Sequence, residues 1–165
     1  MTVQLATSSW RAQWETSKVG PLAAQPVRIS LGLPKFWPAA AAFPYVAELA
    51  PAGLLQIEDD AEFERRYRTR LDRIGVETLR HRFEQIEPTV GVRRLCLLCF
   101  EDLSAGEDCH RRTFAAWWQE RTSETVPEVG KLAKTTLAGA AQEMPANRAL
   151  SGPDFGATSP REAQR

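Results

Sequence analysis

The sequence predicts an α/β protein with a small, mostly parallel β-sheet flanked by helices in a Rossmann-like arrangement. One observation is the apolar run "LCLLCF" at residues 95–100, which is typical of a strand buried on both faces. A second is a pair of amphipathic helical patterns just before this run, and a third is an aromatic helical pattern just after it. Alternation of strands and helices favours a parallel sheet covered by helices.

Three segments are expected along the chain. Residues 1–26 form an N-terminal extension, in which Ser9 caps a short helix that carries Trp10 and Trp14 on one face. Residues 27–134 form a single α/β domain. Residues 135–165 are rich in Ala, Gly, Ser and Pro, and we expect a disordered tail because they bury too little apolar area to offset the entropy of ordering.

Two strands are expected at the start of the α/β domain. Apolar and polar residues alternate over residues 27–31, and Gly32 then ends the pattern. A short second strand is expected over residues 45–49, which prolines bracket on both sides. We expect both strands to lie beside the apolar strand at residues 95–100, which is the predicted centre of the sheet.

Helices are expected before and after the central strand. An aspartate at position 59 or 60 caps the first and Gly75 ends it, and a second amphipathic helix runs on toward Pro88. The next helix begins near residue 109 and ends near residue 121, and "ETVPEVG" after it is expected to add a last short strand. The buried stripe of this last helix is expected to comprise Phe114, Ala115, Trp117 and Trp118.

The charge composition limits the classes of partner. The chain has 21 Lys and Arg against 21 Asp and Glu, for a formal net charge of zero, so no global field attracts nucleic acid or an anionic membrane. No apolar run approaches the ~20 residues of a membrane span. Three cysteines do not make a disulfide framework, and the first residues lack the apolar stretch of a secretory signal. We therefore expect a cytoplasmic protein with reduced thiols and no membrane partner.

The segment "CFEDLSAGEDCHRR" is the expected ligand site. Parallel sheets bind ligands beyond the carboxyl ends of their strands, where the next helix presents free N–H groups. With Asp108 as the expected N-cap, the side chains of His110, Arg111 and Arg112 surround that helix start, and Gly32 ends a neighbouring strand. Guanidiniums and helix N–H groups together bind phosphates and carboxylates well. We therefore expect a small anionic or nucleotide-like ligand at these four residues.

The competing interpretation of the two arginines is structural. Acidic side chains surround them in the sequence, and neighbouring charges often only pair with one another. In this view Arg111 or Arg112 neutralises the loop and holds it against the strand, with the carboxylate of Glu101 as a buried partner.

Glu101 and Cys109 are the expected catalytic residues. Glu101 ends an otherwise apolar strand, where a carboxylate can act as a general base or a nucleophile. Cys109, at a helix start beside cationic residues, is placed where a thiol becomes a reactive thiolate. Against this role, Cys is also a common small residue at a helix start, and the Cys109 and His110 side chains would diverge within a helix.

The motif "CLLC" is not expected to bind metal. In an extended strand, Cys96 and Cys99 point to opposite faces, so we place Cys96 in the core and Cys99 at the border of the site. A zinc site formed by Cys99, Cys109 and His110 is a less favoured alternative. We expect no metal and no cofactor.

An arginine stripe on the helix before Gly75 also has two interpretations. Arg66, Arg70 and Arg73 share one side of this helix, which could follow a phosphate backbone. Acidic residues punctuate the same segment, so a solvated face with salt bridges is favoured over a nucleic-acid surface.

The chain resembles the domain of unknown function 488 family. The resemblance is carried by "LCLLCFE", "GEDCHRRTFAAWW" and "VPEV", with "ISLGLP", "ELAP" and "EFERRYRTRLDRIG" before them. It covers residues 27–129 and implies a small bacterial α/β protein whose strand-end Glu and Cys-His-Arg motif correspond to Glu101, Cys109, His110 and Arg111. Residues 31–33 and 47–49 differ from the commoner form of the family, which has Gly-His and Asp-Val-Arg there.

The expected function is binding of an anionic or nucleotide-like small molecule at the strand-end Glu and the Cys-His-Arg helix start, with hydrolase or transferase chemistry through Glu101. A non-catalytic binding or regulatory module is the alternative. A nucleic-acid-associated protein that uses the arginine stripe is the third and least favoured interpretation. The sequence does not predict an oligomeric state.

Overall fold

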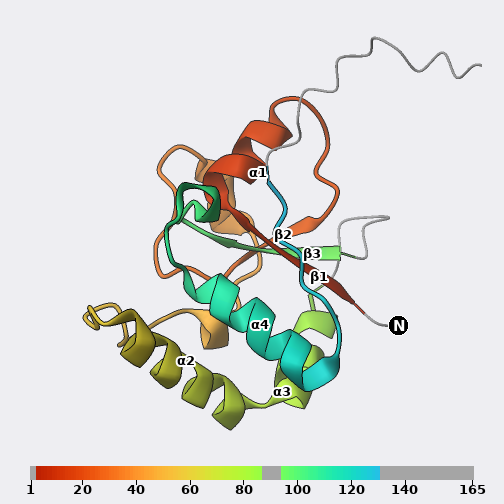
Figure 1. Cartoon of the computed structure of the whole chain (residues 1–165). Coiled ribbons are helices and arrows are strands. Elements are labelled where there is room, and N and C mark those ends of the chain that lie inside the picture. Colours follow the sequence, from red (N-terminus) through yellow and green to blue (C-terminus); the bar gives the residue numbers. More distant parts are fainter. Residues whose placement is uncertain (1–2, 87–93, 131–165) are drawn as a thin grey trace, which may run out of the picture. The chain divides into compact units, whose positions relative to one another are not determined.

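The computed structural model describes residues 3–86 and 94–130 of the chain, and within them the protein is an α/β protein with a three-stranded parallel sheet (Figure 1). The strands are β1 (Gln4–Ser9), β2 (Gln25–Arg28) and β3 (Arg94–Cys99), in the spatial order β1-β3-β2. The apolar run is therefore the central strand, as predicted. It pairs with β1 from Gln4↔Arg94 to Ser9↔Cys99 and with β2 from Gln25↔Leu95 to Arg28↔Leu98.

The first 26 residues are part of this domain, which differs from the expected extension. β1 is an edge strand of the sheet, and helix α1 (Trp10–Ser17) follows it directly. This strand could not be predicted from the sequence, because its residues Thr7, Ser8 and Ser9 are polar but buried. Their hydroxyls bond to Glu128, to the carbonyl of Val129 and to the N–H of Ala12, respectively. The helix that Ser9 was expected to cap is confirmed.

The expected second strand at residues 45–49 is wrong. The segment makes one isolated bridge, between Arg28 and Tyr45, and then forms a 3₁₀ turn at Ala47–Leu49. Two backbone hydrogen bonds to Arg28 are all that this bridge provides, because the turn begins directly after Val46. β2 itself ends at Arg28, earlier than predicted, and residues 29–33 form the loop beside the candidate site.

Three helices cover one face of the sheet and α1 lies on the other (Figure 1). They are α2 (Asp60–Ile74), α3 (Val76–Glu84) and α4 (His110–Thr122). Asp59 caps α2, and Gly75, with φ of +81°, separates α2 from α3, so the two predicted amphipathic helices are confirmed. On β3, Leu95 and Leu97 pack with the three-helix side, whereas Cys96 and Leu98 pack with the aromatic residues near α1.

The segment after α4 returns to the sheet. The expected strand in "ETVPEVG" is reduced to an isolated parallel bridge between Thr7 and Glu128, flanked by two backbone hydrogen bonds to Thr7. The expected tail at residues 135–165 lies outside the described residues. No helix in residues 3–86 and 94–130 has the length and apolar content needed to cross a membrane.

Candidate functional site

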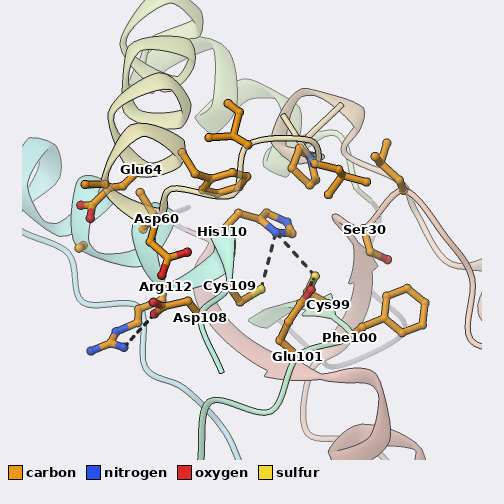
Figure 2. A pocket seen from close by; sticks show the side chains of 18 of the residues that line it. Ser30, Asp60, Glu64, Cys99, Phe100, Glu101, Asp108, Cys109, His110 and Arg112 are labelled. Atoms are coloured by element: carbon orange, nitrogen blue, oxygen red, sulfur yellow. Dashed lines mark hydrogen bonds and ion pairs between the residues drawn. The ribbon is translucent and has the colours of Figure 1, made fainter. Parts of the chain in front are cut away.

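A pocket of about 850 Å³ lies at the carboxyl end of β3. Its walls come from the end of β3, the start of α4, the first turns of α2, the loop before α2 and the loop after β2. This is the edge of the sheet where the sequence placed the ligand site. Figure 2 labels ten of the lining residues: Ser30, Asp60, Glu64, Cys99, Phe100, Glu101, Asp108, Cys109, His110 and Arg112. Leu31, Gly32 and Phe63 also line the pocket.

Four reactive side chains, Cys99, Glu101, Cys109 and His110, meet in this pocket and are called here the Cys–His–Glu cluster. The Cys99 Sγ lies 2.8 Å from the Glu101 Oε2 and 3.7 Å from the His110 Nδ1. The Cys109 Sγ lies 3.6 Å from the same Nδ1. Figure 2 shows the contacts of the imidazole with both sulfurs. The cluster therefore joins the end of β3 to the start of α4.

The backbone at the start of α4 explains why these groups meet. The N-cap is Cys109 rather than the expected Asp108, and its backbone is extended, with φ of −151° and ψ of 141°. Cys109 therefore lies outside the helix, and the expected divergence of the Cys109 and His110 side chains does not apply. Cys99 and Glu101, two residues apart at a strand end, supply the opposite half of the cluster.

The His110 ring is held from two directions. Its Nε2 lies 3.0 Å from the carbonyl oxygen of Ile29, which can only accept a hydrogen bond, so we assign the proton to Nε2. In the neutral ring, Nδ1 is then the acceptor that faces the two sulfurs. Tyr67 packs edge-on against the imidazole with ring centroids 5.5 Å apart, and its hydroxyl donates to the carbonyl of Leu49. Sequence reasoning missed these two supports, because the first is a main-chain group and the second belonged to a helical core stripe.

The contacts within the cluster shift the pKa values of its two thiols in opposite directions. The hydrogen bond with Cys99 is the largest cause that lowers the pKa of Cys109, to about 6, although burial opposes it. The same hydrogen bond and burial raise the pKa of Cys99 well above its ordinary value. Burial alone would raise the pKa of Glu101, but hydrogen bonds from the thiols outweigh it and lower that pKa. The Glu101 carboxylate is therefore ionised at neutral pH, and Cys109 is the thiol whose deprotonation the cluster favours.

Arg111 lies behind the pocket and is not among the residues that line it. It is fully buried, and its guanidinium donates to both carboxylate oxygens of Glu128 and to the carbonyl oxygen of Glu101. The Glu101 carboxylate itself faces Cys99. Glu128 is thus the acidic partner of Arg111, and sequence reasoning missed it because it lies 17 residues further along the chain, beyond the neighbouring acids that were considered.

The other expected ligand residues do line the pocket. The Arg112 side chain is 71% exposed and forms an ion pair of 3.4 Å with Asp108. A Cβ on Gly32 would lie 3.4 Å from the ring of Phe100, so this glycine allows the loop after β2 to approach the end of β3 closely. His110 is in the cluster. The structure therefore brings His110, Arg112 and Gly32 to one pocket, with Arg111 outside it.

The polar lining of the pocket is mainly acidic. The lining contains the four carboxylates of Asp60, Glu64, Glu101 and Asp108 and one guanidinium, that of Arg112. Apolar side chains such as Leu55 and Phe63 provide much of the remaining wall. The electrostatics of this lining favour neutral or cationic groups over anions.

Two arginines of the stripe on α2, Arg66 and Arg70, make contacts within the protein. Arg66 pairs with Glu62 on the same helix, and Arg70 donates to the carbonyl oxygens of Ala50 and Ala52. These contacts are those expected of a face that braces the helix and the preceding loop.

Three cluster residues can hold a metal ion. The ligand atoms of Cys99, Cys109 and His110 all lie within 4.8 Å of one another, and all three residues are buried. Among the described residues, this is the group of three His, Cys, Asp or Glu side chains whose ligand atoms lie close enough together to hold a metal ion.

The comparisons with known proteins found no matching family model, no matching curated protein and no matching solved structure. The resemblance to the domain of unknown function 488 family stays a prediction.

Proposed function

We propose that this protein is an enzyme that acts on a small organic molecule held in the pocket, as a hydrolase or a transferase. The observation that carries the proposal is the convergence of Cys99, Glu101, Cys109 and His110 on one pocket wall. A carboxylate, an imidazole and two thiols from separate segments serve catalysis better than they serve packing, because apolar side chains would fill the same volume without the cost of burying polar groups.

Glu101 is the general base of this proposal. Its carboxylate is half-buried at the pocket wall and ionised, so it can accept a proton from water or from a substrate hydroxyl. Cys109 supplies the sulfur of the reacting centre. A deprotonated sulfur either attacks an electrophilic carbon or binds a metal ion, and both roles need the same placement on the pocket wall.

The lining favours a substrate with an apolar body and a neutral or cationic polar group. Leu55 and Phe63 offer the apolar contacts, and Asp60 and Glu64 offer the acidic ones. The anionic or nucleotide-like ligand expected from the sequence would have Arg112 as its guanidinium contact, in competition with Asp108. We also propose that the fold is Rossmann-like, which is supported by a site at the carboxyl ends of parallel strands. A cytoplasmic location is part of the same proposal.

The proposal is tested by turnover. The purified chain is screened for hydrolysis of nitrophenyl esters, amides, glycosides and phosphoesters, and each active compound is repeated with Glu101→Gln. We expect this variant to keep its melting temperature within a few degrees and to lose turnover by on the order of 10²-fold or more, the usual contribution of a general base. Glu77→Gln is the control, since it removes an exposed carboxylate from the first turn of α3, outside the pocket, and is expected to retain most activity.

Two results would overturn the proposal. One is a folded Glu101→Gln variant with unchanged turnover. The other is a wild-type chain that turns over none of these substrate classes while binding neutral and cationic ligands in thermal-shift assays, which would establish the binding-module alternative.

A further inference from the structure

The donor atoms in the Cys–His–Glu cluster are those that zinc prefers. Zn²⁺ binds thiolate sulfur and imidazole nitrogen, and the cluster offers two sulfurs and the unprotonated Nδ1 of His110. The three residues are only 3%, 8% and 4% exposed for Cys99, Cys109 and His110, respectively. The Nδ1 acceptor has the two sulfurs within 3.7 Å, and sulfur is at best a weak hydrogen-bond donor, so a metal ion is a better partner for this nitrogen than the sulfurs are.

The two nitrogen–sulfur distances match those of a tetrahedral zinc site. With Zn–S near 2.3 Å and Zn–N near 2.0 Å, tetrahedral angles place a sulfur and a nitrogen about 3.5 Å apart. The Nδ1 of His110 lies 3.7 Å from the Cys99 Sγ and 3.6 Å from the Cys109 Sγ. An ion therefore fits among the three atoms with only small side-chain shifts.

We propose that Cys99, Cys109 and His110 bind a Zn²⁺ ion and that the remaining coordination position faces the pocket beside the Glu101 carboxylate. Three protein ligands and a position open to the pocket are the pattern of catalytic rather than structural zinc. This inference rests on the proposed function only in that both use the same pocket. With zinc bound, the Cys109 sulfur is a ligand and not a free nucleophile, and any thiol proton is released to solvent on binding.

The groups around the ligands support this assignment. The carbonyl of Ile29 accepts from the Nε2 of His110, which is the usual way in which a zinc-binding histidine is oriented. Two thiolates balance the charge of Zn²⁺, and the nearby Glu101 carboxylate adds one negative charge. The buried guanidinium of Arg111 bonds to the carbonyl of Glu101 and interacts with the charges of both sulfurs, so it offsets that charge.

Metal binding by the full-length chain tests the proposal without any substrate. The protein is stripped with a chelator under reducing conditions. One sample is titrated with ZnCl₂ against a colorimetric zinc indicator, and a second metal-free sample is titrated with CoCl₂. We expect one zinc per chain and a higher melting temperature. The cobalt form is expected to show the thiolate-to-metal band and the strong visible bands of tetrahedral Co²⁺.

Three variants assign the ligands. Cys99→Ser, Cys109→Ser and His110→Gln are each expected to bind zinc at least tenfold more weakly, and the two cysteine variants to weaken the thiolate-to-cobalt band. Cys96→Ser is the matched control, because Cys96 lies on the same strand but packs against the opposite side of the sheet. It is expected to bind zinc as the wild type does, and circular dichroism establishes that each variant is folded.

The possible outcomes separate this inference from the proposed function. A folded wild-type chain that binds no zinc, a weak octahedral cobalt spectrum, or undiminished binding in the two cysteine variants overturns the zinc site. None of these results affects the Glu101 turnover test. If each of the three ligand variants weakens zinc binding but the wild-type chain shows no turnover, the metal site is supported and the proposed enzyme activity is not.

Discussion

Glu101 uses its two polar groups for different tasks. Its main-chain carbonyl accepts from Arg111, whereas its carboxylate takes part in the cluster through Cys99. The sequence left open whether this residue pairs with an arginine or faces a ligand. The structure shows that Arg111 bonds to the main-chain carbonyl of Glu101, while the carboxylate lines the pocket, because a peptide carbonyl and a side chain at a strand end point in different directions.

The Cys109 thiol gives a pH-dependent prediction at the same scale. Its pKa is lowered to about 6, so in the zinc-free chain the thiolate fraction rises as the pH increases through 6. We expect the rate of iodoacetamide labelling at Cys109, followed by mass spectrometry, to have its midpoint there. A midpoint near the ordinary ~8.5 of a free cysteine would contradict the prediction.

Cys96 is the internal control for that measurement. Burial raises its pKa to about 12, so it stays a thiol over the whole range and is expected to label only when the chain unfolds.

At the scale of elements, Arg111 ties α4 to two other segments. Its contacts reach the carbonyl at residue 101 and Glu128, and Glu128 also accepts from Thr7 of β1. Arg111 therefore joins the start of α4 to the end of β3 and to the chain after α4, and Glu128 extends this network to β1.

Removing this cation is expected to destabilise the protein. Arg111→Ala leaves the Glu101 carbonyl and Glu128 without their partner, and we expect unfolding to require about 3 kcal/mol less in urea denaturation. The low end of the range for buried pairs applies because Glu128 is 35% exposed. Arg112→Ala removes an exposed pair and is expected to cost about 1 kcal/mol or less. Equal losses in the two variants would refute the structural role of Arg111.

The elements that could be predicted from the sequence are those with a local signal. Helices α2 and α3 each have a periodic apolar face, with Gly75 between them, and β3 has an uninterrupted apolar run. β1 could not be predicted because its buried hydroxyls depend on partners such as Glu128, 121 residues away from Thr7. Local propensity carries no information about such a pairing.

Some features of the candidate site could likewise be predicted from the sequence, and others could not. Its position followed from the general property of parallel sheets, and Glu101, Cys109, His110 and Gly32 were all expected in it. The meeting of both sulfurs with the imidazole was not favoured, because an N-cap at Asp108 would have put Cys109 inside the helix. A shift of one residue in the helix start decides the geometry, and sequence patterns do not resolve helix ends that finely.

For the whole molecule, the sheet depends on its first strand. β1 pairs with the central strand over six residues and holds the chain after α4 through Thr7 and Ser8. We expect deletion of residues 1–9 to abolish cooperative thermal unfolding, followed by circular dichroism. Deletion of residues 135–165 is the comparison and is expected to leave the melting temperature within a few degrees. A cooperative transition that survives the first deletion would restore the view of residues 1–26 as an extension.

The hydrogen bond between His110 and the carbonyl of Ile29 also bears on how this protein can change over evolution. Every residue type carries a main-chain carbonyl, so substitution at position 29 does not delete the acceptor that orients the imidazole. The neighbouring Leu31 and Leu33 are 44% and 42% exposed, and residues 30–32 line the pocket. Position 31 is therefore open to substitution, unlike Gly32 beside Phe100, and a library randomised at Leu31 is a natural starting point for changing which molecule the pocket accepts.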